Sequence, residues 1–210
     1  MQAYIDDLEE DERFKLYDAR DGTFLINYAS WRDIYNRLFV VNDFPDEWSA
    51  VRFHSRWTKS CSGGLPIEKT PEAMQRFAKN PQFVFRSAEA CHVFISLQQS
   101  DGREQASDGG YSKYPFKDRI VSTMLFLFEL PDGHDRLHAY GQPAPMEKAT
   151  PKVLHEMSMR VDLKAGKSYC VVPSPRQPGT EGRFHLSFYV DKPQHDFDVH
   201  RADDPSNRCK

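Results

Sequence analysis

The segment Arg183–Val190 alternates apolar and polar side chains at every second position. An extended chain would carry on one side Phe184, Leu186, Phe188 and Val190, and on the other side the polar residues. This period is typical of a β-strand with one buried face and one face in water. A second strand is predicted at 169–172, and a loop rich in proline and glycine joins the two into a hairpin. Such a hairpin requires a larger antiparallel sheet around it.

Most of the upstream chain provides further strands. Short runs of β-branched and aromatic residues are separated by turn signals such as Pro131-Asp132-Gly133. The expected strands are 50–57, 82–86, 92–98, 120–130, 136–140, 155–162, 169–172 and 183–190. We therefore predict a mainly β fold, an eight-stranded antiparallel β-sandwich made of two four-stranded sheets. One short helix is expected over 71–78, with Thr70 as its N-cap and Pro71 at its first position.

A smaller unit precedes the sandwich. The sequence predicts a strand over 23–28, a helix over 30–36 with Ser30 as its N-cap, and a strand over 38–41. This strand–helix–strand segment is too small to bury its own apolar face. It is therefore either the tail of another domain or a docking flap. The charged residues before it, Met1 to Arg20, are interpreted as a solvated end of the chain.

Composition excludes several classes of function. The 210 residues carry a net charge of −3 without a long Lys/Arg cluster, which argues against nucleic-acid binding. No apolar run approaches the roughly 20 residues of a membrane span, and the acidic N-terminus does not resemble a signal peptide. The four cysteines are far apart in the sequence. This spacing argues against a zinc site or a disulfide framework and fits a reducing, cytoplasmic location.

Few residues suggest catalysis. A nucleophilic cysteine needs a base within reach. The best internal pair is Cys61, in a Gly-rich loop, with His54 seven residues earlier, although no usual nucleophile context surrounds them. Cys91 and Cys170 are interpreted as core residues, and no histidine group has the spacing of a metal site.

Three loops are candidate binding segments. Clustered side-chain oxygens at Asp101–Asp108 and Asp132–Asp135 could attract calcium, although the second segment is also a good hairpin turn. A thin basic face comprises Lys113, Lys117 and Arg119. It could touch an acidic partner or an anionic lipid surface, and the alternative, which we favour, is a solvated loop with one buried aromatic anchor.

The segment 163–190 resembles the third domain of the calpains, which are calcium-regulated cysteine peptidases. In that family a Leu-x-x-Gly-x-Tyr strand leads to Val-Pro-Ser, a loop with Pro and Gly, and a Gly-x-Phe strand. The matching residues here are Leu163, Gly166, Tyr169, Val172, Pro173, Ser174, Pro178, Gly179, Gly182 and Phe184. The run that opens the same domain is matched by Trp57, Gly63-Gly64 and Asn80-Pro81-Gln82.

The N-terminal unit is similar to the last strand–helix–strand of the calpain protease core, through Asp21-Gly22-x-Phe24 and the residues 31–38. The resemblance covers roughly residues 19 to 200. It implies three parts: a C-terminal remnant of a protease core at 1–45, a domain III-like sandwich at 46–202, and a tail at 203–210. The family's catalytic Cys, His and Asn belong to the part of the core before this remnant, so no catalytic residue is expected here.

One metal site is implied in part by the resemblance. The family's protease core binds calcium near its end, where Asp21 would supply a carboxylate and Ala19 a backbone carbonyl. Thr23 stands where the family often has Glu, and the remaining ligands would come from outside this chain. The family's long acidic loop corresponds here to 86–90, in which Glu89 is the one carboxylate. Binding of calcium is thus possible but not certain from the sequence, and no other cofactor is expected.

The leading hypothesis is a non-catalytic, regulatory part of a calpain-like cysteine peptidase, docked on a protease core in intracellular proteolysis. The alternative is a stand-alone sandwich module that binds a protein or phospholipid surface. A third interpretation is a fragment with no function of its own.

Overall fold

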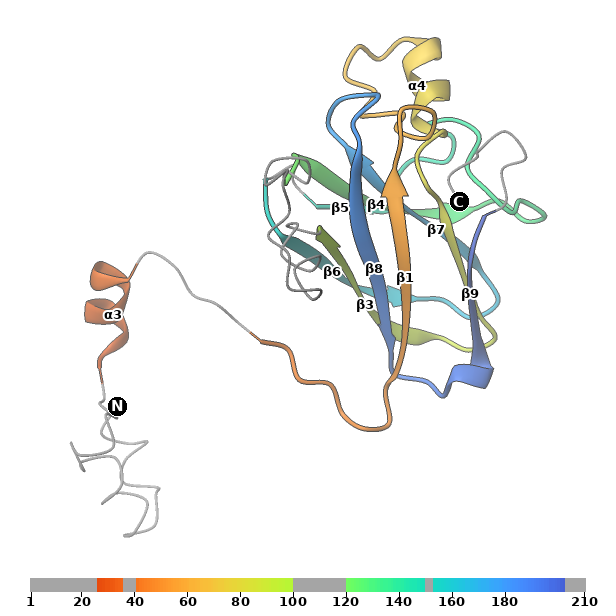
Figure 1. The fold of residues 1–210 in the computed structure, drawn as a ribbon. Coiled ribbons are helices and arrows are strands. Elements are labelled where there is room, and N and C mark those ends of the chain that lie inside the picture. The colour runs from red at the N-terminus through yellow and green to blue at the C-terminus, as the bar shows by residue number, and fades with distance from the viewer. Residues whose placement is uncertain (1–25, 36–40, 100–119, 150–152, 203–210) are drawn as a thin grey trace, which may run out of the picture. The chain divides into compact units, whose positions relative to one another are not determined.

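The computed structural model describes residues 26–35, 41–99, 120–149 and 153–202, and the chain divides into two compact units, Met1–Asp43 and Phe44–Lys210 (Figure 1). The described part of the first unit is one short helix, α3 (Tyr28–Ile34). Its N-cap is Asn27, whose side-chain oxygen accepts a hydrogen bond from the backbone N–H of Ser30 at 2.9 Å. The prediction of Ser30 as the cap is therefore wrong, because the helix begins two residues earlier than expected. Of the strand predicted at 23–28, residues 26–28 are described and form no strand, because Tyr28 begins α3. The strand predicted at 38–41 lies outside the described residues except for Val41.

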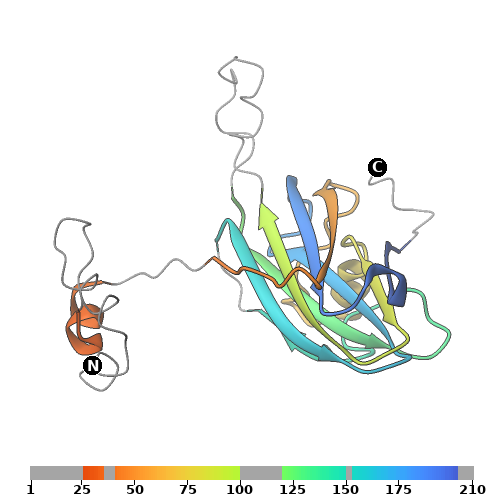
Figure 2. The same cartoon turned by 90° about the horizontal axis from the view of Figure 1, so that it is seen from below.

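The second unit is an antiparallel β-sandwich, which confirms the predicted mainly β fold. Its four-stranded sheet has the order β1-β8-β3-β6 and its five-stranded sheet the order β5-β4-β7-β2-β9 (Figure 2). The first sheet contains β1 (Ser49–Trp57), β3 (Cys91–Gln99), β6 (Glu156–Leu163) and β8 (Gly182–Val190). The second contains β2 (Phe83–Ser87), β4 (Thr123–Leu130), β5 (Glu147–Lys148), β7 (Ser168–Pro175) and β9 (Phe197–Arg201). Two helices complete the unit, α4 (Pro71–Phe77) and the 3₁₀-helix η3 (Gln194–Asp196).

The strand inventory differs from the prediction at three places. The segment 136–140 is not a strand, because its backbone forms only an isolated bridge between Ala139 and Gln142. Its apolar residues instead cover the sheet from outside. Two short edge strands were not expected: β5 pairs with β4 through two residues, and β9 pairs with β2. The described sheets therefore have four and five strands rather than four each.

The predicted hairpin of β7 and β8 is also wrong. β7 pairs with β4 and β2 in the five-stranded sheet, whereas β8 pairs with β1 and β3 in the other sheet. The loop over 176–181 therefore crosses from one layer to the other. The expected alternation of β8 is confirmed, since Phe184, Leu186, Phe188 and Val190 are fully buried.

Two apolar cores hold the sandwich together. The larger lies between the sheets and contains inward-facing residues of both, including Phe188 of the four-stranded sheet and Phe85 of the five-stranded sheet. The smaller lies on the outer face of the five-stranded sheet, where Phe77 of α4 packs edge-on against Phe126 at 5.2 Å and against Tyr140 at 5.0 Å. Burying one such aromatic ring stabilises the fold by about 1.5–3 kcal/mol. Thus α4 and the segment 131–142 cover this outer face.

The helix α4 forms as its sequence predicts. Thr70 is the N-cap, with its hydroxyl oxygen accepting from the backbone N–H of Ala73 at 3.2 Å, and Pro71 opens the helix. None of the described helices has the length and apolar character needed to cross a lipid bilayer.

Candidate functional site

The glycine pair and the Asn-Pro-Gln motif meet in a buried polar junction. The Oδ1 atom of Asn80 accepts a hydrogen bond from the backbone N–H of Gly63 at 2.9 Å. Its Nδ2 atom lies within hydrogen-bonding distance of the carbonyl oxygens of Phe77 (2.9 Å) and Gly64 (3.3 Å), and of Oγ of Ser174 (3.1 Å). One fully buried side chain thus ties together the Gly-rich loop, the end of α4 and β7.

Both glycines of this junction are required by the backbone. A Cβ added to Gly63 would lie 1.9 Å from the carbonyl oxygen of Arg76. Gly64 has a φ of +67° and its Cβ would lie 2.5 Å from the backbone nitrogen of Pro178. The close approach of this loop to α4 on one side and to the crossing loop at Pro178 on the other therefore explains the Gly-Gly pair in structural terms.

The remaining motif residues also make buried structural contacts. The indole N–H of Trp57, on β1, donates to the carbonyl oxygen of Pro173, on β7, at 3.1 Å and so joins the two sheets. Gln82 donates to the carbonyl oxygen of Leu137 at 2.9 Å and accepts from its N–H at 2.7 Å. The hydroxyl of Tyr169 accepts from the backbone N–H of Lys164 at 2.9 Å, which closes the turn before β7. These motifs hold the layers and loops together.

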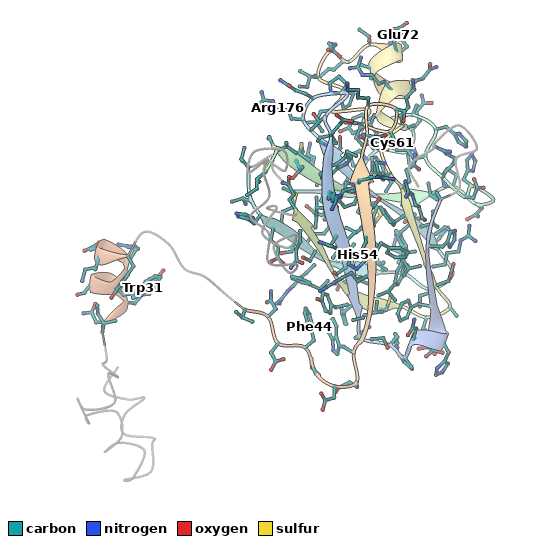
Figure 3. All side chains as sticks on the ribbon, viewed as in Figure 1. Trp31, Phe44, His54, Cys61, Glu72 and Arg176 are labelled. Atoms are coloured by element: carbon teal, nitrogen blue, oxygen red, sulfur yellow. The ribbon has the colours of Figure 1, made fainter. Side chains whose placement is uncertain are left out.

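The candidate pair of Cys61 and His54 is not assembled for nucleophilic catalysis. Cys61 is fully buried, and its sulfur is disulfide-bonded rather than a free thiol. His54 is exposed midway along β1, while Cys61 lies beyond the end of that strand (Figure 3). The argument from cysteine spacing against disulfides is therefore wrong at Cys61.

The two free cysteines are buried core residues, as expected. Burial raises the pKa of the Cys91 thiol, and it raises the pKa of Cys170 to about 12. Because the thiolate is the reactive form of cysteine, neither side chain is prepared for attack on a substrate.

The calcium candidates fall into two groups. Asp21, Ala19 and the segment Asp101–Asp108 lie outside the described residues, as do the basic residues Lys113, Lys117 and Arg119. The segment 132–135 is described and forms a turn, in which the Oδ1 atom of Asp132 lies 3.6 Å from Nζ of Lys167. Within the described ranges, no group of three or more His, Cys, Asp or Glu side chains could hold a metal ion.

The turn that corresponds to the acidic loop carries an ion pair. Glu89 accepts a hydrogen bond from Nζ of Lys192 at 2.9 Å. This hydrogen bond and the nearby positive charge lower the pKa of the Glu89 carboxyl. An open groove of about 400 Å³ lies beside this turn, and it is lined by mixed charges that include Arg86, Lys167, His195 and Asp198.

An aromatic clamp, formed by Phe44, Trp48, Phe94 and Tyr189, fixes the start of the sandwich. The ring of Phe44 stacks on Tyr189 at 4.2 Å with an interplanar angle of 10°, and it lies 5.3 Å from Phe94 and 5.4 Å from Trp48. The segment before β1 is thereby held on the outer face of the four-stranded sheet. Sequence reasoning missed this clamp, and two aromatic residues four positions apart just before the first strand were its signal.

The same face carries a basic band, formed by Arg52, His54 and Arg56 of β1 and by Arg183 and His185 of β8. The register places Arg52 opposite Ser187, His54 opposite His185 and Arg56 opposite Arg183. The two histidine rings lie 4.4 Å apart. β1 and β8 run side by side at the front of Figure 1. Sequence reasoning placed Arg183 and His185 on the wet face of β8, but the neighbouring strand could not be known without the register.

These features define an antiparallel β-sandwich domain whose signature residues are structural. Residues 53–189 match the family described as calpain large subunit, domain III, and the chain belongs to this family. It is 28% identical over 216 residues to calpain-8 of Rattus norvegicus, with 90% of this chain and 29% of the relative covered. It is 25% identical to the calpain-1 catalytic subunit of Homo sapiens, with 90% and 28% covered, and 26% identical to calpain-5 of Mus musculus, with 77% and 24% covered. The chain therefore spans less than a third of the length of these relatives.

Proposed function

We propose that this chain is a non-catalytic regulatory and docking part of a calpain-type cysteine endopeptidase that acts in cytoplasmic proteolysis. One observation carries the proposal: Trp57, Gly63 and Asn80, which are among the residues that identify the family, make buried contacts that stiffen the sandwich. A rigid domain attached to a protease core can position that core or restrain it. The match to calpain domain III supports association with such a core.

The N-terminal unit provides the connection in this proposal. Residues 1–45 would correspond to the end of a protease core, and 46–202 to the regulatory sandwich. The aromatic stripe of α3 fits such a role, because Tyr28, Trp31 and Tyr35 stack in sequence with centroids 5.9 and 6.0 Å apart. Tyr28 is 72% exposed, which leaves apolar surface for a partner. Asp21 and Ala19 would contribute to a calcium site whose other ligands the core supplies.

The proposal is tested by combining the purified full chain with a recombinant protease core of a calpain, with and without calcium. We expect a complex by size-exclusion chromatography and a changed rate of peptide hydrolysis by the core. Trp31→Ala should weaken the complex by about tenfold, because an aromatic anchor contributes on the order of 1–2 kcal/mol. Arg32→Ala, on the same helix, is the matched control.

Two results would contradict the proposal. The first is peptide hydrolysis by the chain alone that disappears in Cys61→Ala. The second is the lack of any complex with the core together with binding to lipid vesicles or to another protein, which would favour the stand-alone module.

A further inference from the structure

The two outer faces of the sandwich differ. The outer face of the five-stranded sheet is covered by α4 and the segment 131–142. On the four-stranded sheet, Arg52, His54, Arg56 and Arg183 of the basic band are exposed. We propose that the basic band is a docking surface for an extended acidic polypeptide segment of a partner protein, with carboxylates at every second residue.

The spacing of the band favours an extended segment. Arg52, His54 and Arg56 occupy every second position of β1, so their Cα atoms repeat at roughly 6.6 Å. A partner in the extended conformation has the same repeat between alternate residues. Each carboxylate on the outward side of the partner can therefore lie opposite one of these three side chains of β1 and its neighbour on β8. In a helical acidic segment, the carboxylates on one side repeat at the helical pitch of about 5.4 Å, so fewer of them lie opposite the basic side chains of β1.

The position of β1 allows the partner to approach as an added strand. β1 lies at the edge of its sheet, and among the described strands it pairs with β8 alone. A strand added beside β1 would place its side chains about 4.5–5.5 Å from those of β1 on the same face. Main-chain hydrogen bonds would then supply affinity, and the charged rows would select the register.

The charges of Arg52 and Arg183 are available to a partner. Arg52 donates from Nε to Oγ of Ser187 at 3.0 Å, and its Nη2 lies 3.5 Å from the hydroxyl of Tyr189. These neutral groups orient the guanidinium without cancelling its charge. Neither Arg52 nor Arg183 forms an ion pair with a carboxylate of the described residues. The nearest acidic side chain in the same rows is Glu156 on the far edge strand, where Ser96 donates to it at 2.7 Å.

The aromatic residues of this face favour a polypeptide over a membrane. A surface that inserts into lipid needs apolar side chains free to enter it. Here Phe44 and Tyr189 stack on one another, and Phe94 is only 6% exposed beneath them. The guanidinium of Arg160 lies 5.6 Å over the ring of Phe94 and covers it further. The inference goes beyond the proposed function, because it rests on this surface alone and needs no protease core.

The test uses the full chain and two fluorescein-labelled peptides of the same composition, one with alternating Glu and Thr and one with all Glu residues in a block. Fluorescence anisotropy at about 50 mM salt should show binding of the alternating peptide. The double variant Arg52→Thr/Arg183→Thr should weaken binding by about tenfold. The matched control Lys148→Thr/Lys164→Thr removes the same charge from exposed positions elsewhere and should change binding less than about twofold.

Thermal unfolding of each variant verifies that it is folded, which is expected because all four substituted side chains are exposed. The proposal is overturned if the alternating peptide does not bind, or if the control loses as much affinity as the band variant. Equal binding of the block peptide would overturn the added-strand geometry. Binding to vesicles with about 30 mol% phosphatidylserine that the peptide cannot compete away would assign the face to membranes instead. Complex formation with the protease core is measured separately, so each proposal can fail alone.

Discussion

At the scale of single residues, Asn80 shows how a short motif acts through hydrogen bonding. Its side chain satisfies polar groups of three different segments inside a region without access to water. A buried polar group that loses its partner carries its full desolvation cost. The hydrogen bonds of the Asn80 side chain therefore explain why asparagine suits the first position of the Asn-Pro-Gln motif.

Replacement of Asn80 by Ala should destabilise the sandwich by about 3 kcal/mol, because it leaves the buried N–H of Gly63 and the carbonyl oxygen of Gly64 without their partner. Urea denaturation followed by tryptophan fluorescence measures the effect. The control Gln177→Ala lies on the exposed crossing loop and should stay within about 0.5 kcal/mol of the unmodified chain. A loss as small in Asn80→Ala as in this control would show that water replaces the side chain.

His92 offers a pH-dependent test at the same scale. Its Nδ1 atom lies 2.6 Å from Oδ1 of Asp162. This hydrogen bond, then the charges of Asp162 and Asp191, raise the pKa of His92 in the folded chain. The pair therefore stabilises the fold at pH values below the pKa of an unfolded histidine, and this contribution is lost as the pH rises through the raised value.

NMR titration should give His92 a higher pKa than a histidine in an unfolded peptide, and Asp162→Asn should lower it. Glu156→Gln, on the same strand but paired with Ser96, is the control and should leave the His92 titration in place. If the pKa of His92 is the same in Asp162→Asn as in the unmodified chain, the pair with Asp162 is not the cause of the raised pKa.

At the scale of elements, the sequence predicts which face of a strand is buried, but it does not predict which other strands that strand pairs with. The alternation of β8 correctly predicted which side chains are buried, because burial depends on the strand alone. It could not predict that β7 belongs to the other sheet, because the pairing of β7 depends on β4 and β2, which are distant from it in the sequence. The segment 136–140 was misread since Leu137 and Tyr140 are apolar for a different reason, which is to cover a sheet from outside. β9 was missed because its alternation is short and interrupted by charged residues.

The same limit applies to the candidate sites. Polar residues at alternate positions of β1 and β8 were visible separately, but the basic band exists only because the register brings His54 opposite His185. The catalytic candidate failed for a related reason: Cys61 and His54 are close in sequence, yet one is buried and the other is exposed.

The segment that precedes β1 behaves as an element although it has no regular structure. Phe44→Ala should destabilise the sandwich by about 1–2 kcal/mol, since it removes the ring that stacks between Tyr189, Phe94 and Trp48. It should also speed cleavage near residue 44 in limited proteolysis. Ile67→Ala, at a side chain that is 60% exposed, is the control for the loss of an apolar group. Equal cleavage of both variants would mean that the clamp does not hold this segment.

At the scale of the whole molecule, the larger unit begins at Phe44 and contains both apolar cores. A domain with its own core can fold without the rest of the chain. The boundary at this residue also agrees with the clamp, because the ring of Phe44 packs on Tyr189 and Phe94 of the sandwich.

Two truncated chains test this boundary. A chain that starts at Phe44 should unfold in one cooperative transition with the melting temperature of the full sandwich. A chain that starts at Ser49 lacks Phe44 and Trp48 and should melt roughly 4 °C lower. Differential scanning calorimetry measures both. Failure of the longer chain to fold would show that the sandwich needs residues 1–43.

The pairing of β1 with β8 has a consequence during synthesis. Ser49 pairs with Val190, so the first strand of the sandwich leaves the ribosome about 140 residues before its only described neighbour in the sheet. At translation rates of about 5–20 residues per second, this interval lasts roughly 7–30 seconds. During that time β1 has an apolar side and an unpaired edge, both of which attract other nascent chains. Yield in a heterologous host should therefore depend on chaperone supply and temperature more than on the stability of the finished sandwich.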